Sequence, residues 1–189
     1  MKRLALIFSF LGVLFSSYGQ EIVQFEAIFG DSFKEWRFTF VENSFEENSS
    51  TLDGEISLSW GMSNRWDEYV VNLDGFRSRI NLNVVGTMFS FELHNDDNES
   101  MIAKRVWPRD LSEWKISHEQ SNYEVKVLNP NDPEEWIITK DNKVLCNILT
   151  EFQGDPRNWI IDYKSPDIIP QEIQKLAIVI IIHIVCPKI

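Results

Sequence analysis

The most apolar run of the chain after residue 19 lies almost at the C-terminus, at residues 176–186. Its only strongly polar side chain is His183. A segment that is apolar on every side must be enclosed on every side. Its eight Leu, Ile and Val side chains represent about 12–24 kcal/mol of gross burial before ordering entropy is subtracted. The run therefore predicts a buried element that the rest of the chain surrounds.

This run favours a helix over a strand or a membrane span. Its eleven residues would cover about 16 Å as a helix, whereas a membrane span needs about 20 residues. The β-branched content favours a strand, but the run is about twice the usual strand length. The preceding segment decides for a helix, because Pro170 suits a first helical turn and Glu172 complements the positive end of the helix dipole. A final strand is the alternative.

Between residues 22 and 163 the chain reads as one short strand after another. Residues 36–40 place Trp and two Phe on one face and Arg and Thr on the other, which is the period of a half-buried strand. The same alternation recurs at residues 56–60, 80–84 and 89–93. Turn residues separate these stretches. We expect about twelve strands joined by short turns.

A repeated pattern opens several of the predicted hairpins. A Trp followed two residues later by Ile occurs at Trp114, Trp136 and Trp159, at spacings of 22 and 23 residues, and Trp36 begins a similar stretch. We interpret each of these tryptophans as pointing inward. Hairpins of this kind around one buried helix predict a mainly β fold. We expect a closed antiparallel barrel of about twelve strands around a C-terminal hydrophobic helix, in one domain over residues 20–189.

This arrangement resembles the tubby C-terminal-like barrel, a group that also contains the phospholipid scramblases and the LURP-one-related proteins. The resemblance rests on the Trp-x-Ile hairpins, on residues 159–163 and on the apolar helix at residues 170–186. It implies a closed barrel of twelve strands threaded by that helix. The chain departs from the group in being acidic and in lacking a cysteine-rich stretch. The group's lipid function is therefore carried over to no residue here.

The N-terminus predicts export. Lys2 and Arg3 precede an apolar stretch at residues 4–15, and small residues follow up to Gly19. This is the pattern of a secretory signal peptide over residues 1–19, with cleavage near Gly19 and a secreted or periplasmic product.

The charge of the chain excludes one class of partner. It is −11 for the whole chain and −13 once Lys2 and Arg3 are removed. An acidic surface repels nucleic acid, so no nucleic-acid partner is expected. No cofactor is expected either.

The two cysteines, Cys146 and Cys186, leave two interpretations open. In an exported protein they could form a disulfide. Two separate buried thiols are the interpretation that we favour.

The candidate ligand-binding residues are few. Lys104, Arg105 and Arg109 form the one basic cluster that could hold an anion, although an ordinary solvated edge has the same composition. Trp66 and Trp107 fall outside the repeated pattern. They are the tryptophans that we expect to be available for a ligand.

A hard cation such as Ca²⁺ could bind Asp96, Asp97 and Glu99. The segment lacks the ordered ligand spacing of a calcium loop, and a solvated turn explains it equally. His183 is expected to be a buried neutral histidine with one hydrogen bond.

No catalytic signature is present in the sequence. We therefore predict an exported, non-enzymatic binding or scaffold barrel for a small apolar ligand or a protein partner, without a transmembrane span in the mature chain. The alternative is a secreted Asp/Glu-dependent hydrolase of the glycosidase kind, although no spacing selects a carboxylate pair. An outer-membrane barrel is a third class, and the hydrophobic helix expected in its lumen argues against it.

Overall fold

The computed structural model describes residues 21–29, 32–41, 51–59, 66–73, 75–96 and 100–186 of the 189-residue chain, with the backbone alone at 51 and 52. The predicted signal peptide at residues 1–19 lies outside the described residues. The described chain forms twelve strands and one helix. In chain order they are β1 (Glu21–Phe29), β2 (Ser32–Val41), β3 (Thr51–Leu58), β4 (Glu68–Leu73), β5 (Phe76–Val85), β6 (Met88–Asn95), β7 (Ser100–Trp107), β8 (Asp110–His118), β9 (Ser121–Val127), β10 (Glu135–Lys140), β11 (Lys143–Thr150), β12 (Asn158–Tyr163) and α1 (Gln171–Val185).

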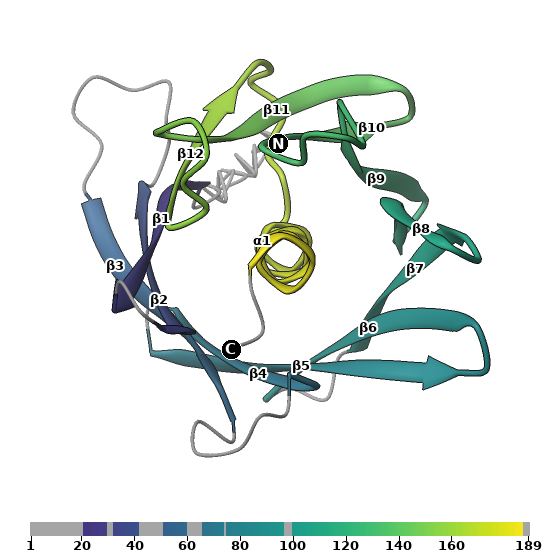
Figure 1. Cartoon of the computed structure of the whole chain (residues 1–189), viewed down its shortest axis with the longest axis horizontal. Helices are drawn as coiled ribbons and strands as arrows, with labels where there is room; N and C mark the ends of the chain where they lie inside the picture. Colours follow the sequence, from purple (N-terminus) through teal and green to yellow (C-terminus); the bar gives the residue numbers. More distant parts are fainter. Residues whose placement is uncertain are drawn as a thin grey trace, which may run out of the picture.

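The strands close into a single antiparallel barrel. Each strand pairs with its neighbours in the sequence, and β12 returns to pair with β1, where Phe25 stands opposite Trp159 (Figure 1). Closure removes the unpaired edges that an open sheet would present. The predicted fold class, a closed barrel of about twelve strands, is confirmed.

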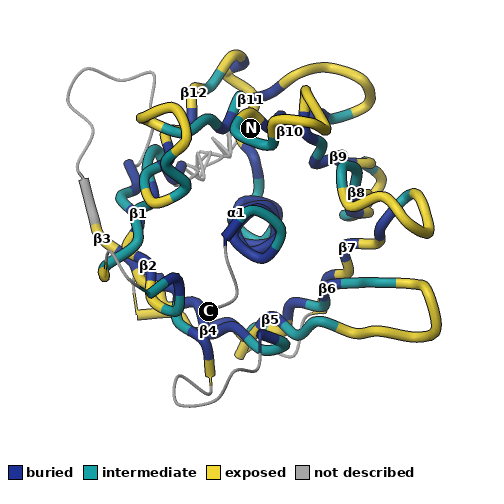
Figure 2. Tube along the Cα trace, viewed as in Figure 1, coloured by how far each residue is buried: buried dark blue, intermediate teal, exposed yellow. Residues whose placement is uncertain are grey.

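The C-terminal run is a helix, as predicted, and the strand alternative is wrong. Figure 1 shows α1 inside the ring of strands, and Figure 2 shows it buried along most of its length. Every residue from Ile173 to His183 is buried. Side chains project from a helix in all directions, so an all-apolar helix needs a wall that meets it on all sides. The inward faces of the strands supply that wall.

Four inward tryptophans mark one end of the barrel. Each is almost completely buried, and its indole N–H donates to the carbonyl oxygen three residues earlier in the chain at 2.8–2.9 Å. The pairs are Trp36 with Phe33, Trp114 with Leu111, Trp136 with Pro133, and Trp159 with Pro156. A buried indole needs an acceptor, and the turn before each strand provides one. We call this end, where α1 finishes, the tryptophan end.

A glutamine holds the start of α1 against the wall. The side chain of Gln174 accepts a hydrogen bond from the backbone N–H of Ile22 at 2.8 Å and donates to the carbonyl of Ile169 at 2.7 Å. The hydroxyl of Tyr163 lies 3.2 Å from the same Gln174 oxygen. These bonds satisfy a buried amide and connect the helix to both strands at the seam, β1 and β12.

Replacing an inward tryptophan should lower the stability of the barrel more than replacing an exposed one. Trp136→Ala deletes a fully buried ring and should lower the free energy of unfolding by about 3–5 kcal/mol. Trp107→Ala is the matched control, because Trp107 is 57% exposed and its loss should cost about 0.5 kcal/mol or less. Urea unfolding followed by circular dichroism measures both variants. Equal losses would contradict an inward tryptophan ring.

Candidate functional site

The barrel end opposite the tryptophan end, where α1 begins, holds several buried polar groups, among them Ser78, Gln174 and Lys175. We call it the mouth and define it by Phe76, Ser78, Asn95, Glu172 and Lys175. The strand and helix periods explain their convergence. Ser78 lies on an inward position of β5, Asn95 closes β6, and the two charged residues lie one turn apart on the first turns of α1.

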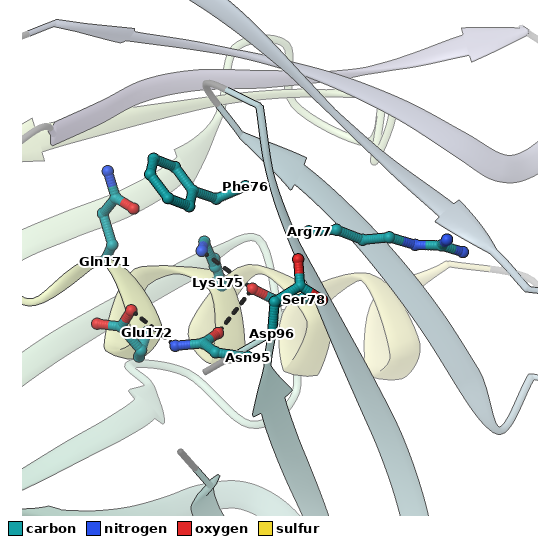
Figure 3. A pocket seen from close by; sticks show the side chains of 8 residues that line it. All are labelled: Phe76, Arg77, Ser78, Asn95, Asp96, Gln171, Glu172 and Lys175. Atoms are coloured by element: carbon teal, nitrogen blue, oxygen red, sulfur yellow. Dashed lines mark hydrogen bonds between the residues drawn. The ribbon is translucent and has the colours of Figure 1, made fainter. Parts of the chain in front are cut away.

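A directed chain of hydrogen bonds crosses the mouth (Figure 3). The ammonium of Lys175 donates to Ser78 Oγ at 3.2 Å. The Ser78 hydroxyl donates to Asn95 Oδ1 at 2.8 Å, and Asn95 Nδ2 donates to Glu172 Oε1 at 3.3 Å. The chain therefore runs from a cation to a carboxylate through two neutral groups, each of which accepts at one side and donates at the other.

Lys175 is buried without a counter-charge in contact. Its side chain is among the buried charged groups, with the residue 2% exposed. Ser78 is its one hydrogen-bond partner among the described residues, and no carboxylate of that part of the chain lies within 4.0 Å of its Nζ. Burial lowers the pKa of Lys175, and the nearby carboxylate of Glu172 acts in the opposite direction.

Two adjoining cavities open at the mouth. They have volumes of about 450 and 460 Å³, within the range of small-molecule sites. Both are lined by Asn95 and Glu172, which stand at the boundary between them. The remaining lining residues are Phe76, Arg77, Ser78, Asp96, Gln171 and Lys175 in the first cavity and Leu93, Ser100, Met101, His118 and Glu119 in the second.

The mouth suits binding better than nucleophilic chemistry. A hydroxyl beside a buried amine is the arrangement of a serine nucleophile with a lysine base. Here, however, the Ser78 proton is directed to Asn95, and Lys175 donates to Ser78 instead of accepting from it. The serine thus acts as a link between two neighbours.

The predicted basic cluster is not assembled. Lys104 and Arg105 are successive residues of β7, so they lie on opposite faces of the wall, with Lys104 exposed and Arg105 buried. Arg105 donates to the carbonyls of Thr87 and Pro108 and lies 4.4 Å from the ring centre of Phe89. Its guanidinium thereby joins two turns at the tryptophan end.

The other cationic and aromatic candidates lie apart from the mouth. Arg109 is exposed in the turn before β8. Trp66 is buried in the core instead of being available on the surface. Trp107 is exposed, and its indole donates to Glu113 at 2.9 Å.

The candidate cation site falls largely outside the described residues. Asp96 follows β6 and lines the first cavity, whereas Asp97 and Glu99 are not described. Within the described part of the chain, no three His, Cys, Asp or Glu side chains are grouped as metal ligands.

His183 is buried, as expected, near the tryptophan end. Its Nδ1 lies 2.9 Å from the hydroxyl of Tyr69. Burial raises the pKa of Tyr69 well above its ordinary value.

The two cysteines are separate buried thiols, so the disulfide alternative is wrong for this structure. Cys146 lies within β11 opposite Tyr163, whereas Cys186 follows α1 with its Sγ 4.0 Å from the carbonyl of Pro156 in the loop before β12. The two residues belong to different levels of the barrel. Burial raises the pKa of Cys146 to about 12 and raises that of Cys186 as well.

Comparison with known proteins yields no match: no family model, curated protein or solved structure matches this chain. The resemblance to the tubby-like barrels therefore stays a prediction. In the described residues, no helix has both the length and the apolar character needed to cross a bilayer.

Removing the buried charge should stabilise the ligand-free protein. A buried polar group with few partners costs about 1–3 kcal/mol, so Lys175→Met should raise the free energy of unfolding by a similar amount near pH 7. The lowered pKa means that the folded state binds fewer protons than the unfolded state. The gain should therefore shrink as pH rises towards 10.5, the ordinary lysine value. Urea unfolding at several pH values measures it, with exposed Lys115→Met as control. If Lys175→Met instead lowered the free energy of unfolding, burial of the Lys175 charge would not be a net cost to the folded protein.

The cysteines should be unreactive in the folded protein. At pH 8 neither thiol should react with a chromogenic disulfide reagent, because both are buried and the thiolate is disfavoured. Two thiols should appear after denaturation without reductant. A Phe152→Cys variant supplies an exposed control, since Phe152 is 57% exposed. Finding no thiol after denaturation would indicate a disulfide.

Proposed function

We propose that the protein is an exported, non-enzymatic binding barrel, similar in architecture to the tubby-like group, and that its ligand site is the mouth. One observation carries this proposal. Lys175 is a buried cation beside a cavity of about 450 Å³, and its ammonium has one hydrogen-bond acceptor in the described protein. An uncompensated buried charge is costly, so its presence suits a function that uses the charge.

The proposed ligand is small and polar. The barrel interior is filled by α1 and the core side chains, and the two cavities of the mouth adjoin the start of the helix. The lining of the first cavity combines an ammonium, a guanidinium, two carboxylates, two amides and a hydroxyl with the ring of Phe76. A mostly polar lining favours a polar ligand over the apolar one expected from the sequence.

Binding is favoured over carboxylate-dependent hydrolysis. A glycosidase needs two opposed carboxyl groups. In the described mouth Glu172 is only partly buried, and Asp96 is an exposed residue in the turn after β6. Glu119, which lines the second cavity, is exposed in the turn between β8 and β9, so the described mouth holds no pair of buried carboxyl groups.

Nuclear magnetic resonance with a panel of small polar compounds tests the proposal. Amino acids, organic acids, amines and sugars, each at millimolar concentration, should include a class that shifts the backbone amides of Ser78, Asn95 and Lys175. Ser78→Leu should abolish these shifts by filling the first cavity. Ser57→Leu is the matched control, because Ser57 alternates with buried Ile56 and Leu58 and so lies on the outer face of β3.

Shifts that map to the tryptophan end, or that persist in Ser78→Leu, would refute a ligand site at the mouth. The same conclusion would follow if no compound of the panel shifted these amides.

A further inference from the structure

We propose that the mouth binds a zwitterionic α-amino acid with an apolar side chain. In this arrangement its carboxylate contacts Lys175, its ammonium contacts Glu172 and its side chain lies in the second cavity. This inference rests on the proposed function and assigns a ligand class to the same site.

Lys175 is the residue that we expect to contact the carboxylate of the ligand. An ammonium carries three N–H donors, and the one described hydrogen bond uses a single donor. The remaining donors have no acceptor among the described residues, and Lys175 lines the first cavity together with Phe76 and Gln171 (Figure 3). The adjacent α1 N-terminus has no side-chain cap in the described chain. Its positive dipole end therefore also favours an anion near Lys175.

The ammonium end follows from Glu172. Its carboxylate accepts a single described hydrogen bond, the 3.3 Å bond from Asn95, and no described Lys or Arg nitrogen lies within 4.0 Å of it. Glu172 borders both cavities, so it faces whatever occupies them. A carboxylate in this place disfavours a polyanion such as a phosphate and favours a ligand that carries its own positive group.

The hydrogen-bond chain keeps the two charges available. Without intervening groups, Lys175 and Glu172 lie one helical turn apart and would be expected to pair with each other. Ser78 and Asn95 instead link them through bonds of 3.2, 2.8 and 3.3 Å (Figure 3). Each charge is oriented by a neutral partner and remains free to contact a ligand group of opposite sign.

The apolar side chain follows from the second cavity. Its wall includes the buried side chains of Leu93 and Met101, on β6 and β7. They meet the boundary formed by Asn95 and Glu172. When the charged groups of the ligand lie at this boundary, a side chain of leucine or methionine size would extend into the second cavity and contact Leu93 and Met101.

Calorimetric titration of the full mature chain at pH 7 tests this assignment with four probes. L-Leucine carries both charges, 4-methylpentanoate lacks the ammonium, 3-methylbutylamine lacks the carboxylate, and inorganic phosphate tests for a general anion site. We expect the wild type to bind leucine most tightly. Removing one charged contact from the ligand should weaken binding by about 10-fold or more.

Two variants assign each charge to its partner. Lys175→Met, with Lys175→Gln as a second replacement, should weaken leucine and 4-methylpentanoate by about 10-fold or more and leave 3-methylbutylamine nearly unchanged. Glu172→Gln should weaken leucine and 3-methylbutylamine and leave 4-methylpentanoate unchanged or tighter. Exposed Lys115→Met and Glu35→Gln serve as matched controls and should alter none of the affinities.

The result that overturns the amino-acid assignment differs from the result that overturns the mouth itself. Leucine binding that is insensitive to either variant, or phosphate binding as tight as leucine binding, refutes the zwitterion. If another compound then still binds and is lost in Ser78→Leu, the mouth remains the ligand site. If the wild type binds no compound at the mouth, both the amino-acid assignment and the mouth as ligand site are refuted.

Discussion

The enclosure of α1 by a closed wall is the constraint on which the rest of the structure depends. A helix that is apolar on every side would expose that surface to water if it were alone. A closed layer of strands with apolar inner faces would likewise enclose an unfilled apolar interior. Each supplies the surface that the other must bury. Closure between β1 and β12 matters for the same reason, since an open edge would expose both the sheet and the helix. The seam is held by the stacked rings of Phe25 and Trp159 and by Gln174.

The polar groups around the two ends of α1 are paired in different ways. At the tryptophan end, four indoles and one terminal nitrogen of Arg105 donate to nearby carbonyls, and these donors are satisfied locally. At the mouth the helix leaves its apolar environment with Glu172 and Lys175 still near the interior. Their charges are oriented by Ser78 and Asn95 without being neutralised. This contrast is why the mouth, and not the tryptophan end, is the proposed ligand site.

The basic cluster that was predicted from sequence adjacency does not form, and the reason is physical. Lys104 and Arg105 are neighbours in sequence but face opposite sides of a strand, so adjacency separates them. Ser78, Asn95 and Lys175 were missed because they are distant in sequence and individually ordinary. One signal was available: Lys175 is the last charged residue before the apolar run, at one turn from Glu172. That spacing places a cation at the boundary of the buried helix.

The sequence by itself determined the parts of this protein that depend on local period. Alternation specified the strands, turn residues separated them, repeated tryptophans marked inward positions, and an all-apolar run required an enclosing wall. Tertiary structure alone decided which polar side chains meet at the mouth and that Cys146 and Cys186 remain apart. Both outcomes depend on strand register and on the level that each residue occupies around the helix. These quantities are set by packing between distant segments, and no local pattern encodes them.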